Sequence, residues 1–303
     1  MNDSRKPARA VMFTVIPWFV GQFESILNER GHKLAGIVTA PGPRTRRSEE
    51  YREVAKLARP GLDVVISNYP GRWADMIRPL RPDLIFCAGF NWVLPADVLE
   101  LPPLGVFNLH DSLLPKNRGL FATSWALRTG HPHGITFHRM TPGLDSGPIL
   151  AQHPVPFGDG EDLSDATPRL NAARIDGLTE AVDRILEGFP GVPQDESEAT
   201  YTPGRFEPEW REVRWDKPLR EVFFQVRSWS GLRGVPLGAF AEVDGERVLI
   251  KKAKPLYDQI DLRSDPRGAV IERNDTEMMV QCSDGPLKIT GWEAVPDIVE
   301  VKQ

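Results

Sequence analysis

The first third of the chain alternates short apolar runs with helical patterns, and this alternation constrains the fold more than any other feature. The apolar runs suit buried strands, and they cover residues 10–16, 33–39, 62–66 and 83–88. Apolar residues at helical spacing fill the segments between them, from Phe19 to Gly31, over 48–59 and over 72–80. This order predicts βαβ crossovers and a Rossmann-like, mostly parallel sheet with helices on both faces. Ligands bind such sheets at the carboxyl ends of the strands.

The rest of the chain predicts a second, smaller domain. A long helix over residues 163–188 closes the first domain, and a segment rich in Pro, Gly and acidic residues follows it. Beyond that segment come a helix over 218–229 and five short strand patterns separated by turn residues, which predict a small antiparallel, OB-like β-barrel. We therefore expect a catalytic domain at 1–189, a linker at 190–215 and a barrel domain at 216–303.

Charge and cysteine content narrow the class of protein. The formal net charge is −5, and residues 205–303 hold 16 Lys and Arg against 18 Asp and Glu, so no general attraction to nucleic acid or anionic membranes is predicted. Cys87 and Cys282 are isolated, which fits a reducing compartment. No signal peptide and no apolar run of membrane-spanning length occurs in the sequence. We expect a cytoplasmic protein without a membrane partner.

The stretch from Gly105 to Ile149 carries the candidate catalytic residues. Asn108 and His110 lie two residues apart in a predicted strand, so their side chains point to the same side. Asp145 lies in the turn-rich sequence PGLDSG after the predicted strand 134–140, and we expect this loop to aim the carboxylate at the same crevice. An amide, an imidazole and a carboxylate are the groups that acyl transfer to an amine requires.

Motifs of other enzyme classes are absent from the sequence. There is no GxGxxG after the first strand, no GxxxxGK[ST], no GxSxG and no HExxH, which argues against a dinucleotide enzyme, an NTPase and a serine hydrolase. His131 and His133 have no partners at metal-ligand spacing, so we expect no metal.

The sequences NLHDSLLPKNRG and GLDSGPILAQ, in this order and at this spacing, resemble the formyltransferases that use 10-formyltetrahydrofolate. The segments VMFTVIPWF, GFNWVLP, TYTP and RWDKP extend the resemblance over nearly the whole chain. It implies that Asn108, His110 and Asp145 are catalytic, with 10-formyltetrahydrofolate as the co-substrate and no metal. The acid and base roles of His110 and Asp145 are not distinguished by the sequence.

The same resemblance implies where the folate binds. The matching residues are Phe90, Asn91, Trp92, Val93, Leu94, Thr141, Gly143 and Leu144. Trp92 and Leu94 also suit ordinary packing at the foot of the following helix. The loop that shapes the opening of the site matches Ser112, Leu113, Leu114, Pro115, Arg118 and Gly119, and a simple turn held by Pro115 and Gly119 is the alternative.

Departures from the pattern of the tRNA-modifying members concern the acceptor. Val15-Ile16-Pro17 replaces a Gly-Thr-Pro turn, the loop APGPRTRRS after the second strand is short and lacks lysine, and Asp111 resembles members that act on small amines. We therefore expect a small-molecule amine acceptor, such as an amino sugar, an amino acid, a hydroxylamine or a natural-product intermediate. The alternatives are methionyl-tRNA formyltransferase, a 10-formyltetrahydrofolate hydrolase and a non-catalytic folate-binding protein.

Overall fold

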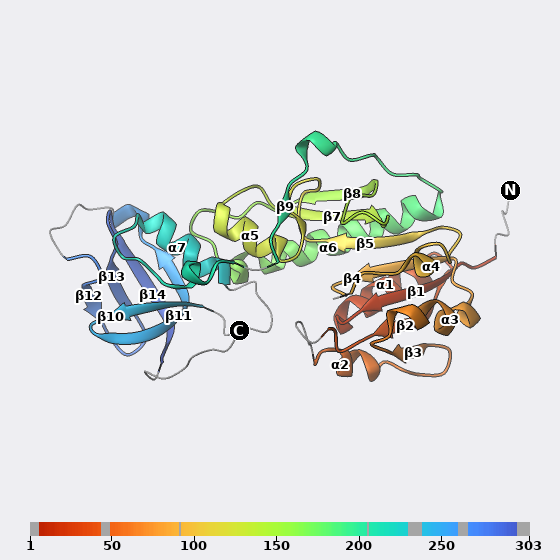
Figure 1. Ribbon diagram of the computed structural model, residues 1–303, viewed down its shortest axis with the longest axis horizontal. Helices are drawn as coiled ribbons and strands as arrows, with labels where there is room; N and C mark the ends of the chain where they lie inside the picture. The colour runs from red at the N-terminus through yellow and green to blue at the C-terminus, as the bar shows by residue number, and fades with distance from the viewer. Residues whose placement is uncertain are drawn as a thin grey trace. The chain divides into compact units, whose positions relative to one another are not determined.

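A computed structural model of the chain describes residues 6–43, 49–90, 92–204, 206–229, 238–259 and 266–295. Its contacts divide the chain into two compact units (Figure 1). The first unit comprises Met1–Arg118, Gly134–Pro154 and Asn171–Thr200, and the second comprises Gly119–His133, Val155–Leu170 and Tyr201–Gln303. The chain therefore passes between the units several times, and the expected boundaries at residues 189 and 215 stay a prediction.

A seven-stranded sheet forms the centre of the first unit, in the order β3-β2-β1-β4-β5-β7-β8. Its strands are β1 (Arg9–Thr14), β2 (Lys33–Thr39), β3 (Asp63–Ile66), β4 (Leu84–Ala88), β5 (Val106–His110), β7 (Gly134–Arg139) and β8 (Ile149–Pro154). The first five pair in parallel, whereas β7 is antiparallel to both β5 and β8. The predicted mostly parallel sheet is confirmed. Two short strands, β6 (Arg118–Gly119) and β9 (Tyr201–Thr202), lie where the chain passes between the units.

Helices connect the parallel strands, and a long helix follows β8. They are α1 (Pro17–Glu29), α2 (Tyr51–Ala55), α3 (Trp73–Ile77), α4 (Ala96–Leu99) and α6 (Leu163–Leu186), with the 3₁₀ turns η2 (Pro70–Arg72) and η3 (Arg78–Leu80) beside α3. Helix α1 begins on Pro17, because the first helical residue needs no N–H donor. It ends at Glu29, and Gly31, whose φ of 72° suits glycine, follows the C-cap residue Arg30.

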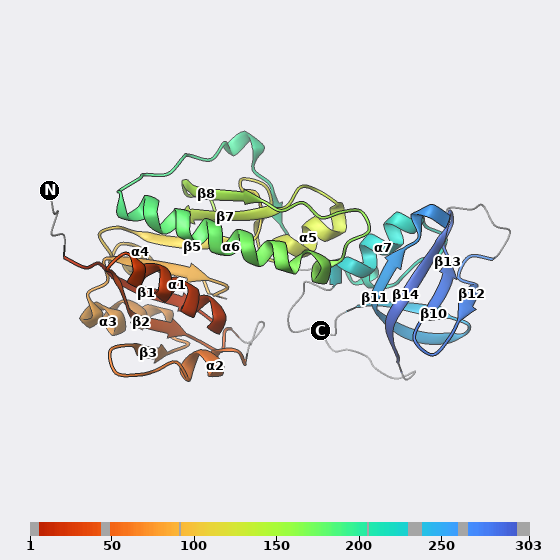
Figure 2. The same ribbon diagram turned by 180° about the vertical axis from the view of Figure 1, so that it is seen from behind.

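Helices cover both faces of the sheet. Figure 2 shows α1 and α6 in front of one face, where the Phe86 and Phe137 rings stack and Gly177 of α6 lies against Phe137. On the opposite face, Trp73 of α3 contacts Phe13 edge to face, in a buried cluster that includes Val106. Because strand residues alternate between faces, Asn108 and His110 lie on the same face as Val106. Asn108 and His110 therefore place two polar side chains on the face that carries this apolar cluster.

The second unit is built on a five-stranded antiparallel sheet in the order β10-β11-β14-β13-β12. Its elements are α5 (Ala122–Thr129), η5 (Pro208–Arg211), α7 (Leu219–Ser228), β10 (Ala239–Val243), β11 (Glu246–Pro255), η7 (Tyr257–Gln259), β12 (Val270–Arg273), β13 (Met278–Gln281) and β14 (Pro286–Ala294). Phe223 of α7 is buried with Ile250 and Ile289 of the sheet. The predicted C-terminal antiparallel domain is confirmed. In the described residues, β10 and β12 are the two edge strands of its sheet and do not pair with each other.

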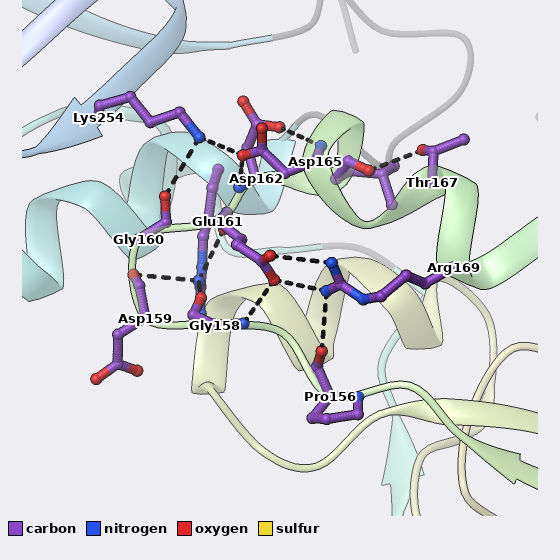
Figure 3. A network of polar contacts seen from close by, with 12 residues as sticks. Pro156, Gly158, Asp159, Gly160, Glu161, Asp162, Asp165, Thr167, Arg169 and Lys254 are labelled. Carbon is purple, nitrogen blue, oxygen red and sulfur yellow. Dashed lines mark hydrogen bonds and ion pairs between the residues drawn. The ribbon is translucent and has the colours of Figure 1, made fainter.

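Charged side chains fix the loop at residues 155–165 within this unit (Figure 3). Lys254 of β11 is ion-paired with Asp165, and Arg169 donates to Glu161 at 2.7 Å and to the Pro156 carbonyl at 3.3 Å. The hydrogen bonds from Arg169 hold the pKa of the Glu161 carboxyl below its ordinary value. Arg227 is buried and donates to the Gly158 and Glu161 carbonyls, and burial lowers its pKa to about 10. These cations therefore stabilise the fold of the loop.

Several elements differ from the sequence-based expectation. The predicted helix over 72–80 is broken into α3 and the 3₁₀ turn η3, because Pro79 lacks an N–H donor. Strand β8 and helix α5 were not predicted. The predicted helix over 48–59 is shorter, with α2 covering Tyr51–Ala55, and residues 44–48 lie outside the described part. No helix in the described residues is long and apolar enough to span a membrane.

Candidate active site

Strand β5 presents the first two candidate residues. Asn108 and His110 follow Val106 on one face, and the next strand in the sheet, β7, places His138 opposite Asn108 and Thr136 opposite His110. Only 7% of the His110 surface is exposed, and its Nε2 lies 2.8 Å from the Asn117 carbonyl oxygen. Because a carbonyl oxygen only accepts, Nε2 carries the proton and Nδ1 of a neutral His110 has a free lone pair.

Asp145 lies beside that lone pair. Its Oδ2 is 3.6 Å from Nδ1 of His110, and its side chain is 13% exposed. The structure thus brings together the three residues that the sequence predicted, but not by the expected route. Because β7 is antiparallel to β5, it ends opposite Phe107, near the start of β5. The loop 141–148 therefore leaves the sheet at the amino end of β5, and not at the predicted carboxyl ends of the parallel strands. It folds back to bring Asp145 to His110.

His138 is the functional candidate that the sequence reasoning missed. It is 1% exposed, and its Nε2 lies 3.2 Å from Nδ2 of Asn108 and 3.5 Å from Oδ1 of Asp145. The carboxylate thus lies between two imidazoles, whose rings are nearly perpendicular at 87°. The available signal was strand alternation, which puts His138 on the same side as Thr136, the residue that pairs with His110.

A network of polar side chains holds the backbone around Asp145. Asp145 has a φ of 47°, a left-handed conformation that is uncommon for residues other than glycine. Gln194 donates to the carbonyls of Asp145 at 2.8 Å and Gly147 at 2.7 Å. The buried Arg118 guanidinium in turn donates to Gln194 at 2.8 Å and to Glu196 at 2.7 Å. The segment after α6 therefore fixes the position of the candidate catalytic carboxylate.

Gly147 is required by close packing in the same loop. A Cβ at this position would lie 1.9 Å from the carbonyl oxygen of Arg139. We expect Gly147→Ala to displace the loop and to lower kcat by about 100-fold, because misplacing a catalytic group by about 1 Å has effects of that size. Steady-state kinetics checks this expectation.

The matched control for this variant is Gly21→Ala in α1. Nothing lies within 4 Å of a Cβ added at Gly21, so this variant should keep wild-type activity. Equal activity of both variants would contradict the steric argument.

The predicted folate segment after β4 divides into buried and exposed residues. Leu94 is 4% exposed and packs in the core with Val98 of α4, which is the packing role left open above. Phe90 and Trp92 contact Trp73 at ring distances of 5.3 and 6.0 Å, while Val93 is 83% exposed. The Nε1 atom of Trp92 is buried without a hydrogen-bond partner among the described residues. Asn91 lies outside the described residues.

The second predicted folate segment lies in the loop that carries Asp145. Leu144 is 54% exposed and Gly143 is also exposed. The hydroxyl of Thr141 is 3.2 Å from that of Ser146, so Thr141 stabilises the turn. Two apolar side chains, Val93 and Leu144, are thus exposed on loops of this unit.

The predicted loop at the opening of the site is mostly a packed turn. Ser112 and Leu114 are buried, and the Ser112 hydroxyl donates to the Lys116 carbonyl at 2.8 Å. Leu113 and Pro115 are half-buried, and Gly119 has a φ of 102°. Arg118 points inward, with none of its side chain exposed. The guanidinium of Arg118 is bonded to Gln194 and Glu196, so Arg118 braces this loop from inside, and the role of the loop at the opening of the site stays a prediction.

Metal and thiol chemistry find no support in the described residues. No group of three or more His, Cys, Asp or Glu side chains there is arranged to hold a metal ion. Both cysteines are free; burial raises the pKa of the Cys87 thiol well above its ordinary range and raises that of Cys282 to about 12. Neither thiol is a thiolate nucleophile at neutral pH.

The chain matches the formyl transferase family over residues 33–182 and the C-terminal domain of formyl transferases over residues 205–294. It is 29% identical over 292 residues to the methionyl-tRNA formyltransferase of Pelobacter propionicus, covering 93% of this chain and 88% of the relative. It is 32% identical over 249 residues to that of Syntrophus aciditrophicus, covering 80% and 78%. The chain belongs to the formyl transferase family and is an enzyme of that class.

Solved structures show the same fold. HypX from Aquifex aeolicus, in complex with tetrahydrofolic acid, superposes with a TM-score of 0.68 at 19% identity, over 96% of this chain and 45% of HypX. The sugar 3N-formyl transferase WlaRD, with dTDP and 5-N-formyl-THF present, gives a TM-score of 0.65 at 14% identity, over 97% of this chain and all of WlaRD. The chain spans somewhat less than half the length of HypX.

Proposed function

We propose that this enzyme transfers the formyl group of 10-formyltetrahydrofolate to a primary amine or hydroxylamine of a small molecule, giving an N-formyl product and tetrahydrofolate. The observation that carries the proposal is the convergence of Asn108, His110 and Asp145 on one face of β5 and its neighbouring loop. The two buried free thiols suit the reducing cytoplasm that we propose as its location.

The residues around this site suit a folate. The exposed side chains of Val93 and Leu144 offer apolar surface to a pteridine ring, and the Nε1 atom of Trp92 is a buried donor without a partner among the described residues. We propose these residues, with Phe90 and the backbone of Gly143, as the donor site. When bound, 10-formyltetrahydrofolate supplies an activated formyl carbon.

The chain's own residues manage the protons and the charge of this reaction. The new bond joins the acceptor nitrogen to the formyl carbon, and the bond from that carbon to the folate nitrogen breaks. Asn108 donates a hydrogen bond to the formyl oxygen as negative charge develops there. The free lone pair of His110 Nδ1 accepts a proton from the attacking amine, and Asp145 stabilises the resulting imidazolium at 3.6 Å. The proton is finally delivered to the departing folate nitrogen.

Charge on the C-terminal sheet favours a small acceptor over tRNA. Binding to the phosphates of tRNA needs lysines and arginines that are free to neutralise them, which releases counterions from the nucleic acid. Here most cations on the described strands of this sheet already have carboxylate partners, in the pairs Arg247–Glu212, Lys251–Glu293, Lys254–Asp165, Arg273–Glu246 and Lys288–Glu277. Methionyl-tRNA is the second candidate, because the sequence relatives reported above are methionyl-tRNA formyltransferases.

An acceptor panel tests the proposal. The enzyme is incubated with 10-formyltetrahydrofolate and amino sugars, amino acids, hydroxylamines or charged initiator tRNA, and tetrahydrofolate release is followed. We expect turnover with a small amine and a rate that changes little between about 50 and 200 mM salt, a range over which phosphate-dependent binding falls by orders of magnitude.

Other outcomes identify the alternatives. Turnover with charged tRNA alone, together with steep loss in salt, would replace the proposal by methionyl-tRNA formylation. Release of tetrahydrofolate and formate without any amine would indicate a hydrolase. Tight folate binding with no turnover would indicate a binding protein.

A further inference from the structure

The buried His138 side chain has a defined role in the hydrogen bonding of this site. Its Nδ1 lies 2.8 Å from the carbonyl oxygen of Arg139, and its Nε2 lies 3.2 Å from Nδ2 of Asn108. Both ring nitrogens are therefore engaged, one by the backbone of β7 and the other by a candidate catalytic amide on β5.

The backbone contact determines which nitrogen carries the proton. A carbonyl oxygen accepts only, so Nδ1 must be the donor and Nε2 of a neutral ring must be the acceptor. The amide of Asn108 can satisfy that acceptor only with its nitrogen, since its oxygen cannot donate. The tautomer of His138 thus selects one of the two orientations of the Asn108 amide.

We propose that His138 is a positioning residue that orients the Asn108 amide for catalysis. One N–H of Nδ2 is donated to His138, and the second N–H of the same nitrogen remains for the oxygen of the formyl group. With the amide rotated by 180°, its carbonyl oxygen would face that developing negative charge and oppose it. This inference rests on the proposed function, because it requires Asn108 to be the donor to that oxygen.

Two titratable groups face His138, and the positioning role requires the His138 ring to be neutral. Asp145 faces it from the loop after β7, with Oδ1 3.5 Å from Nε2, and His110 faces it from β5. The Arg139 guanidinium is turned away, toward the carbonyls of Leu104, Phe189 and Pro190. A protonated His138 would donate from Nε2. The Asn108 amide would then have to turn its oxygen toward His138, and Asp145 would pair with His138 as well as with His110.

The test compares two replacements of His138. His138→Met fills the volume without an acceptor, and we expect kcat to fall on the order of 100-fold with little change in the KM of the acceptor, because the lost interaction acts only in the transition state. His138→Gln keeps an oxygen acceptor near the place of Nε2, and it should recover most of that loss. His153→Gln on β8, where His153 is paired with Glu180 of α6, is the control and should keep wild-type kinetics.

A double-mutant cycle with Asn108→Ala separates this inference from the proposed function. If His138 acts through Asn108, adding His138→Met to Asn108→Ala should change kcat by less than about twofold. Additive losses in the cycle, or equal losses in His138→Met and His138→Gln, would overturn the positioning role. Near-normal turnover of Asn108→Ala alone would instead overturn the proposed catalytic set. Circular dichroism melts confirm that each variant is folded.

Discussion

Replacing His110 by alanine is expected to lower kcat by about 10⁴-fold, the upper end of what a positioned proton-transfer group contributes. The reason is that Nδ1 of His110, beside Asp145, is the base in the proposed reaction, while the Nε2 proton is donated to the Asn117 carbonyl. Single-turnover formation of the N-formyl product measures the chemical step directly.

The control for this variant is His131→Ala. His131 is exposed in the second unit, and its replacement should leave kcat unchanged. His110→Ala should melt within a few degrees of the wild type, since it loses one hydrogen bond to the backbone, worth about 1 kcal/mol. Turnover of His110→Ala within tenfold of the wild type would exclude His110 as the base.

Replacing Asp145 by asparagine is expected to lower kcat on the order of 10³-fold, because the imidazolium of His110 then forms without an anion beside it. Asparagine is nearly the same size and, like aspartate, tolerates the left-handed conformation seen at this position. The variant therefore removes the charge and keeps the loop. Rapid-quench kinetics of the folded variant provides the measurement.

A second replacement separates charge from backbone conformation. Asp145→Ala loses the charge and also the tolerance for a φ of 47°, so it should match Asp145→Asn in kcat but melt at a lower temperature. If Asp145→Asn kept wild-type kcat, the carboxylate would have only a structural role.

Local patterns in the sequence predicted much of this fold. The alternation of apolar runs with helical segments was sufficient for the parallel strands, because buried parallel strands read as continuous apolar runs. The same logic did not apply to β8, which carries Gln152 and His153 among its apolar residues. It also did not predict that β7 runs antiparallel to β5, because strand direction is set by tertiary pairing and not by local sequence.

The candidate site was predictable in its members but not in its supports. Asn108 and His110 share a side by strand alternation, which is a local property. The contact of His138 with Asn108 depends on the register between β7 and β5, and that of Gln194 depends on a segment that returns from beyond α6, so local patterns do not give either contact. Arg118 was placed in the loop at the opening of the site by resemblance, and its burial could not be predicted because its partners Gln194 and Glu196 are distant in the sequence.

The hydrogen bonds from Gln194 to the Asp145 loop limit where this chain can be cut into fragments. A cut after Phe189, where the sequence composition changes, would separate the loop from the residue that fixes its backbone. Chimeras that exchange the C-terminal half between relatives would meet the same difficulty unless the junction falls after Thr200. A functional chimera should therefore take residues 190–200 from the same parent as the Asp145 loop that Gln194 holds.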